Sequence, residues 1–344
     1  MPHAEHVHSR CKPVAGLVLA ATLLAGIGGV HASKPKTQRG AFGVAQQQVQ
    51  TTGDKYFAGE DKVVVASFRV AFGQEVKASA QSSSLFGKSS ASAAMHGTLS
   101  GLDNEVWQAI TDAAHADFLE KLKAAGLTVL EARDVEYGAY GKLAGVSSPA
   151  ALDADQGKLL MFAPTGAKLT MLPGDTGAGS AFSGFNASSA VQVWPAIIRE
   201  QQAGVMSVTY YLDFLNADSS GKTQVLGGDA EVSMGQGLSV RAGSGIGYAT
   251  LKGSQCKGYC PHANGSITLG QAVHSQQAYG RTEDVTKGGV NALGAVSGLL
   301  SGRGFSRKDL QIHADPERYR GISERLLGEA NTALIDALRQ ARGD

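Results

Sequence analysis

The chain has 344 residues, 31 basic and 30 acidic side chains, and a hydrophobic fraction of 43%. The near-zero net charge argues against a nucleic-acid binder, which needs a basic surface, and the hydrophobic fraction argues against general disorder. Glycine is in excess, with 45 of 344 residues, roughly twice its usual share of about 7%.

The amino terminus has the layout of an export signal. Arg10 and Lys12 precede an uncharged apolar run over 14–30, and Ala32 follows at a position that a signal peptidase reads. We therefore expect cleavage near Ala32 and a periplasmic or secreted protein. An uncleaved anchor is the alternative, because the run reaches the lower limit of about 17 residues for a spanning helix. Cys11 precedes the run, whereas lipid attachment needs a cysteine just after it, so we expect no lipid.

The mature chain begins with a polar, Gln-rich segment over 33–60, which we expect to be an extended lead-in. A single domain over 61–344 follows, with a sub-boundary at the Gly/Ser loop 173–187. Alternating apolar residues over 63–72 predict a strand buried on the face of Val64 and Phe68. Ser and Ala dominate 76–99, which is either a linker or a hairpin that turns at Phe86 and Gly87.

Helices are predicted at three places. Residues 104–125 carry an apolar stripe, begin at Asp103 or Asn104 and end at Gly126. A strand over 127–135 follows directly, so strand, helix and strand predict a βαβ-like layer. Residues 188–202 predict a shorter helix despite Pro195. The last helix is capped by Asp315, carries Pro316 in its first turn and runs to about Arg342.

The second half of the chain is rich in predicted strand. Residues 158–163 and 168–172 flank a hairpin-like turn, 205–215 alternate at period two, and 216–223 predict a turn.

A long antiparallel hairpin is predicted from two alternating arms, 237–248 and 266–277. Glycines lie opposite apolar residues in the first arm, so one face is thin there, and either something packs closely on it or the arms bend. The predicted fold class is therefore α+β, with a mixed, largely antiparallel sheet covered by two main helices and a long Gly-rich β-hairpin. The small-residue segment 289–301, with Gly294 and Gly298, predicts a tightly packed helix or loop.

Cys256 and Cys260 lie at the tip between these arms. In an oxidising compartment such a close pair predicts a disulfide that rigidifies a turn. A metal site that uses both thiols and His262 is the alternative, and it lacks an evident fourth ligand nearby.

Signatures of catalysis are missing from the sequence. No Gly-x-Ser-x-Gly elbow occurs, and the run of alternate glycines at 243–247 lies in a predicted strand, where it cannot offer a helix amino terminus to phosphate. We therefore expect no catalytic, cofactor-binding or metal residues and no cofactor. A periplasmic hydrolase of unknown type is an alternative, in which the fold gathers His274 or His313 with carboxylates.

The order of elements resembles that of certain envelope proteins. The segments are KVVVASFRVAF, DFLEKLKAAG, LTVLEARD, YYLDFLNADSSGKTQVLGG and ERLLGEANTALIDALRQAR. In this order they are similar to the curli-secretion channel subunits and to periplasmic domains of the TolB amino-terminal type. The likeness covers about half of the mature chain and includes no diagnostic motif, so no functional residue is carried over. Channel subunits of that kind are lipoproteins, and this chain lacks the cysteine that would carry the lipid.

These observations predict an exported, non-enzymatic envelope protein that binds or scaffolds other envelope components. Its expected partners are envelope proteins or further copies of itself, and no nucleic acid. The alternative implied by the resemblance is an oligomeric outer-membrane secretion channel subunit that contributes the 237–277 hairpin, with 76–99 as a second hairpin. A membrane-crossing strand needs about 9–11 alternating residues, and both arms of the first hairpin meet that length.

Overall fold

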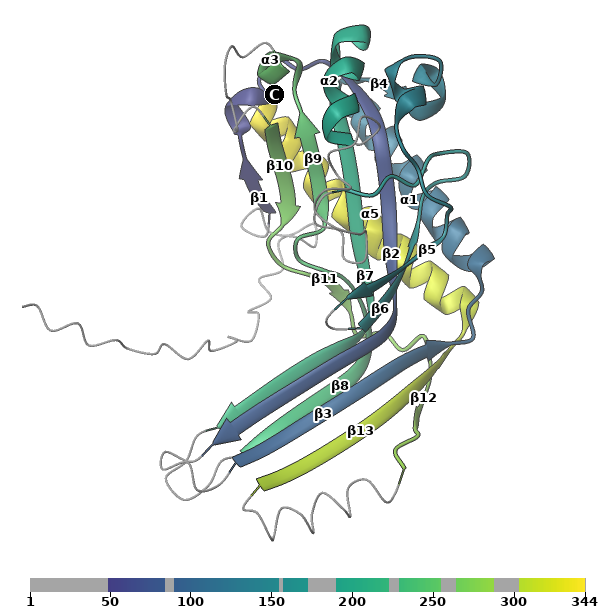
Figure 1. The fold of residues 1–344 in the computed structure, drawn as a ribbon, viewed down its shortest axis with the longest axis vertical. Helices are drawn as coiled ribbons and strands as arrows, with labels where there is room; N and C mark the ends of the chain where they lie inside the picture. Colours follow the sequence, from purple (N-terminus) through teal and green to yellow (C-terminus); the bar gives the residue numbers. More distant parts are fainter. Residues whose placement is uncertain are drawn as a thin grey trace, which may run out of the picture. The chain divides into compact units, whose positions relative to one another are not determined.

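The computed structural model describes residues 49–83, 90–154, 157–172, 190–222, 229–254, 264–287 and 303–343. Over these residues thirteen strands form one mixed sheet, with helices packed on it (Figure 1). The strands are β1 (Val49–Thr52), β2 (Lys62–Ser83), β3 (Ser90–Ser100), β4 (Thr128–Glu131), β5 (Ala150–Ala154), β6 (Gly157–Phe162), β7 (Gly204–Lys222), β8 (Asp229–Val240), β9 (Gly245–Ala249), β10 (Asn264–Leu269), β11 (Val273–Ser275), β12 (Gly280–Asp284) and β13 (Arg303–Ala314). The helices are α1 (Asn104–Ala124), α2 (Ala190–Gln201), α3 (Leu251–Ser254) and α5 (Pro316–Arg342), with short 3-10 turns at Asp54–Tyr56, Ala132–Val135 and Ala139–Lys142.

The main path through the sheet is β1-β10-β9-β7-β2-β3-β13-β12. The pairs β2·β4, β2·β7 and β3·β13 are parallel, and the others are antiparallel. This arrangement confirms the α+β class, with β2, α1 and β4 as the predicted βαβ-like layer.

Helices α1 and α5 cover one face of the sheet and pack against each other. Asp103 caps α1 by accepting a hydrogen bond from the Val106 amide, and Asp315 caps α5 through the Arg318 amide. The predicted apolar stripe of α1 is buried, and α5 buries its own stripe from Tyr319 to Leu338. The core therefore lies between this helix pair and the strands β2, β7, β8, β9 and β10.

The predicted single buried face of β2 is wrong in its phase. Val63 and Val65 lie in the main core with Phe68, whereas Val64 and Ala66 pack in a second cluster under α2. The register of β2 against β7 shifts between Val65 and Ser67, so a bulge moves the alternation by one residue. As a result both faces of β2 are buried in this region.

The long Gly-rich hairpin is confirmed, in two ladders of constant register. Ile246 pairs with Ile267 in β9·β10, and Val240 pairs with Val273 in β8·β11. The large apolar residues of both arms are buried in the main core, namely Leu238, Val240, Ile246, Tyr248, Ile267, Leu269 and Val273. Helix α5 packs across β8, β10 and β11. This hairpin is therefore part of the globular core.

Two predicted features differ from the structure, and two strands of the structure were not predicted. The predicted turn 216–223 is strand, because β7 continues to Lys222 in register with β8. Residues 168–172 make only an isolated bridge, between Leu169 and Val146, and β6 pairs with β5 instead. Strands β12 and β13 were not predicted, because apolar alternation covers only the last residues of β13, from Leu310 to Ala314. The loop 173–187 and the segment 289–301 lie outside the described residues.

Candidate assembly surface

Two antiparallel hairpins continue past the strands that carry the core. In the first hairpin, β2 pairs with β3 from Glu75 opposite Thr98 to Ser83 opposite Ser90. This pairing confirms the hairpin alternative over the linker, and the predicted turn at Phe86 and Gly87 lies outside the described residues. In the second hairpin, 216–222 of β7 pairs with 229–235 of β8. We call these segments the distal hairpins. In Figure 1 they lie together with β13, away from α1, α2 and α5.

The distal hairpins leave strand edges unpaired within the described residues. β2 pairs with β6 only as far as Val76, so 77–83 pairs with β3 on one side alone. The β7 and β8 parts of the second hairpin pair only with each other. A row of unpaired amides and carbonyls on an edge strand is a template for pairing with another chain.

Two bulges at one level direct the hairpins away from the sheet. The parallel pairing of β2 with β7 ends at Phe72 opposite Leu212. Directly after it, register shifts occur between Gly73 and Glu75 in β2·β6 and between Asp213 and Leu215 in β7·β8. Because a bulge bends its strand and increases its twist, the two hairpins leave the sheet at the same place.

Glycine permits close approach at this bend. A Cβ on Gly73 would lie 3.0 Å from Cδ1 of Phe214, a buried side chain of β7. Gly157 has a φ of 144°, and a Cβ there would lie 1.8 Å from the carbonyl oxygen of Glu75. No L side chain fits at position 157, so β6 can follow the bulge of β2 only with glycine.

Gly157→Ala is therefore expected to lower the free energy of unfolding by about 2–4 kcal/mol, because a backbone clash adds to an unfavourable φ. Gly126→Ala is the matched control, since Gly126 has a φ of 80° and nothing lies within 4 Å of its Cβ position. Chemical denaturation of both variants measures the difference. Equal losses would show that the clash with Glu75 contributes nothing.

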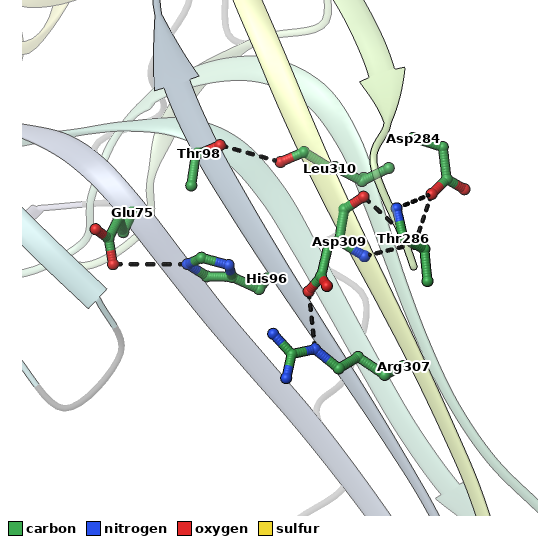
Figure 2. A network of polar contacts seen from close by, with 8 residues as sticks. All are labelled: Glu75, His96, Thr98, Asp284, Thr286, Arg307, Asp309 and Leu310. Atoms are coloured by element: carbon green, nitrogen blue, oxygen red, sulfur yellow. Dashed lines mark hydrogen bonds and ion pairs between the residues drawn. The ribbon is translucent and has the colours of Figure 1, made fainter. Parts of the chain in front are cut away.

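Charged and polar side chains tie the strands together beyond the bend (Figure 2). Oε1 of Glu75 lies 2.6 Å from Nζ of Lys158 on β6, and Oε2 lies 3.6 Å from Nε2 of His96 on β3. The hydrogen bond from the Lys158 ammonium lowers the pKa of Glu75 more than the contact with the His96 ring does. The carboxylate thus joins three strands where the first distal hairpin begins.

On the other side of β3, a second set of contacts fixes β13 and the segment after β12. The Thr98 hydroxyl lies 3.5 Å from the Leu310 carbonyl oxygen, and Nε of Arg307 donates to Asp309 at 2.9 Å. The Thr286 hydroxyl donates to Asp284 at 2.5 Å and accepts from the Asp309 amide at 2.8 Å (Figure 2). The hydrogen bonds that the hydroxyl and the amide of Thr286 donate to Asp284 lower the pKa of Asp284.

The described part of the first distal hairpin has two unlike faces. Ala80, Ala93 and Met95 are buried, whereas Lys77 and Ser79 are exposed. Strand β3 also lies close to β8 without pairing with it within the described residues. A strand with one small apolar face, one polar face and an open edge is suited to pairing with a further strand.

The histidines that the sequence marks as acid or base candidates are dispersed. His274 is exposed on β11 opposite Ser239, and His262 and both cysteines, Cys256 and Cys260, lie outside the described residues. His313 does meet a carboxylate, since its Nε2 lies 3.4 Å from Oε2 of Glu283.

Ser100 lies on the other side of the His313 ring, but its hydroxyl is already engaged. Nδ1 of His313 lies 3.0 Å from Oγ of Ser100, which donates to the Ile312 carbonyl at 3.1 Å. The order of Ser, His and Glu is therefore that of a nucleophilic triad, yet the serine proton is directed to backbone. This chain of contacts ties β3, β13 and β12 together.

His115 of α1 lies in a cleft of about 410 Å³ beside β2 and the loop 164–167. Burial lowers the pKa of His115, and its ring centroid lies 5.0 Å from that of Phe68. Asp112, in the same cleft, accepts from the amide of Thr165 at 2.7 Å and from its hydroxyl at 2.7 Å. The carboxylate therefore holds the loop in place. No group of three metal-ligating side chains occurs among the described residues.

Among the helices of the described segments, none is long and apolar enough to cross a membrane. Comparison with family models, with curated proteins and with solved structures finds no match to this chain.

Proposed function

We propose that this protein is an exported, non-enzymatic assembly component of the cell envelope, and that its distal hairpins bind further copies of the chain. The observation that carries the proposal is the open edge of β2 over 77–83, which continues a strand whose first half is the centre of the core. An edge of this kind, anchored in a rigid core, offers hydrogen bonds that a second copy can satisfy.

Several features of the described residues support self-association. The edge belongs to a hairpin fixed at its base by bulges, glycine and the Glu75 contacts. The second distal hairpin is also unpaired at both of its edges within the described chain. Each copy can therefore offer one edge and accept another, which allows more than two copies to join.

Proline substitutions at two successive positions of β2 test the proposal. Successive amides of a strand point to its two edges in turn, so one of Ala78 and Ser79 faces β3 and the other faces the open edge. Proline removes the amide proton and blocks a neighbouring strand. We expect one of Ala78→Pro and Ser79→Pro to lower the unfolding midpoint, and the other to keep the midpoint and abolish self-association.

The two variants control for each other, because they lie on the same strand and differ only in the edge that they block. Light scattering gives the mass and thermal unfolding gives the midpoint. If the variant with the unchanged midpoint keeps the mass of the parent oligomer, or if the parent is a monomer, the edge has no role in assembly.

The second candidate function is an outer-membrane secretion channel subunit, and one observation favours it. The pairing of β2 with β3 covers nine residues on each strand, from Glu75 to Ser83 and from Ser90 to Thr98, which matches the about 9–11 residues that a membrane-crossing strand needs. The described strands β8, β10 and β11 of the 237–277 hairpin pack under α5, so the distal hairpins are the better candidates for the channel wall.

Fractionation of cells that express the full chain separates the two candidates. A channel subunit is recovered with the outer membrane and forms a detergent-stable oligomer. An assembly component without a membrane role is recovered with the periplasm or the medium, as an oligomer that needs no detergent. Recovery as a soluble monomer contradicts both.

A further inference from the structure

The central sheet has a second face that is made of hydroxyls and glycine. Across β2, β7, β9 and β10 the register aligns two rows of residues. These rows are Ser67, Ser207, Gly247 and Ser266, and Arg69, Thr209, Gly245 and Thr268. The neighbouring positions Phe68, Val208, Ile246 and Ile267 lie in the main core on the opposite face. Much of the glycine of the long hairpin thus lies opposite the apolar core.

A cavity of about 540 Å³ lies over the β7, β9 and β10 part of this face, within the about 300–1,000 Å³ of pockets that hold small molecules. Trp194 and Pro195 of α2 line it on one side, and Tyr211 of β7 also contributes an aromatic ring. Ser207, Thr209 and Ser266 are among the hydroxyl side chains that line it. None of its described lining residues is charged.

The cavity depends on Gly247. A Cβ at this position would meet only the Ser207 carbonyl oxygen, at 3.9 Å. The space above Gly247 is therefore open, and a larger side chain would fill it without displacing the backbone. The face of the sheet at Gly247 is the thin face that the alternating glycines predict, and no described side chain fills the space above it.

Two polar groups that line the cavity have no hydrogen-bond partner within the described chain. Ser207 is 3% exposed, and its Oγ is buried and unpartnered. Nε1 of Trp194 is buried and unpartnered as well. Buried polar groups in folded proteins are almost always hydrogen-bonded, so an unpartnered hydroxyl beside a cavity points to a ligand.

Thr209 adds a polarised hydroxyl. Its Oγ1 accepts a hydrogen bond of 2.5 Å from the guanidinium of Arg69, which is 1% exposed and also donates to the Thr170 carbonyl at 3.0 Å. Because Oγ1 accepts from a cation, the Thr209 hydroxyl retains its proton for donation. The cavity therefore offers a donor from Trp194 and hydroxyls that can donate and accept.

We propose that this cavity is a binding site for a short neutral saccharide. A ring with several hydroxyl groups can satisfy Ser207, Thr209 and Trp194, and its C–H face can lie on the aromatic side chains. An ionic ligand would find no opposite charge on the described lining, and an apolar ligand would leave the hydroxyls unsatisfied.

A peptide strand fits less well. The backbone groups of β7, β9 and β10 beneath the cavity are already paired in the sheet ladder, so a peptide cannot add to the sheet there. This proposal is independent of self-association, since the cavity lies on the core sheet and not on the distal hairpins.

Titration of the full chain with cellobiose, maltose and di-N-acetylchitobiose tests the site, with the unfolding midpoint and calorimetry as readouts. We expect at least one disaccharide to raise the midpoint and bind. Ser207→Ala and Gly247→Val are expected to weaken that binding at least about tenfold, because one removes a hydroxyl and the other fills the cavity. Gly321→Ala on α5 is the control, because Gly321 is exposed and nothing lies within 4 Å of its Cβ position.

The unfolding midpoints of the variants separate loss of the site from loss of the fold. Ser207→Ala removes only an unpartnered oxygen, so its midpoint is expected to equal or exceed that of the parent. If Gly247→Val fails to fold, the binding measured for Ser207→Ala alone tests the site. The proposal is overturned if none of the three disaccharides binds, or if both cavity variants bind as the parent does. It is also overturned if tetra-alanine or glucose 6-phosphate binds in their place.

Discussion

Asn331→Leu is expected to lower the free energy of unfolding by about 2–4 kcal/mol, since it breaks a buried polar network in the core. Asn331 of α5 is fully buried. Its Oδ1 accepts a hydrogen bond of 2.5 Å from the Tyr210 hydroxyl on β7. Its Nδ2 donates to the Ala114 carbonyl at 3.0 Å and to Oδ2 of Asp117 at 2.7 Å on α1. One amide thus joins the sheet to both covering helices.

The loss of stability arises mainly from the hydrogen-bonding groups that the Asn331→Leu substitution leaves without a partner. Leucine is close to asparagine in size, so the cavity term is small, but the Tyr210 hydroxyl is left buried without its acceptor. Burial raises the pKa of Tyr210 well above its usual value, so the hydroxyl cannot escape the cost by ionising near neutral pH. Urea unfolding of the single variant measures the effect.

The double variant Tyr210→Phe with Asn331→Leu is the control. Because it removes the hydroxyl along with its acceptor, it is expected to recover part of the loss relative to Asn331→Leu alone. If the double variant loses as much stability as Tyr210→Phe and Asn331→Leu lose together as single variants, the two residues do not share a hydrogen bond. A loss below about 0.5 kcal/mol for the single variant would contradict the burial of the network.

Phe68→Ala is expected to cost about 3–5 kcal/mol, the usual range for deleting a buried aromatic side chain. Phe68 is 2% exposed and lies between α1 and β7, with ring centroids 5.7 Å from Phe118 and 5.8 Å from Tyr210. Its deletion leaves a void between the sheet and the helix, next to the cleft that holds His115.

Ala66→Gly is the comparison that tests the bulge in β2. Ala66 is buried in the second cluster, under α2, whereas a strand of unbroken alternation would place it beside Phe68. Double-mutant analysis of Phe68→Ala with Ala66→Gly is expected to give additive losses, because the two side chains lie on opposite faces. A coupling above about 0.5 kcal/mol would contradict the phase change. Thermal and urea unfolding supply the four free energies.

Much of the core follows from the sequence. Several of these elements carry local signals in the sequence. The apolar stripe of α1 and the alternation of β7 match the buried faces of these elements, and the predicted Asp315 cap begins α5. The arms of the long hairpin also pair as their alternation predicts, with Ile246 opposite Ile267. These elements are predictable because packing on a single face imposes a regular period on the residues.

The parts that the sequence does not predict depend on tertiary structure. The bulge in β2 leaves no local mark, because residues 63–66 are apolar on both faces. Residues 216–222 have the composition of a turn but form strand because they pair with β8. β13 is held by parallel pairing with β3 from Arg303 to His313, although apolar alternation covers only its last residues. Strand pairing overrode composition in both cases.

The candidate site was only partly predictable. Residues 76–99 could be either hairpin or linker, and only the register of β2 with β3 distinguishes the two. The open edge cannot be inferred from one sequence, since it depends on where β6 ends at Val76. For the cavity, the alternating glycines did predict a thin face, but the unpartnered Ser207 hydroxyl is a property of the fold.

The mass of the full exported chain in solution, measured by light scattering over a range of protein concentrations with and without detergent, is the most direct test of the central proposal. Association through the distal hairpins predicts an oligomer of defined mass, which persists on dilution and is lost on blocking the open edge of β2 with proline. A monomer at every concentration, with and without detergent, would contradict it.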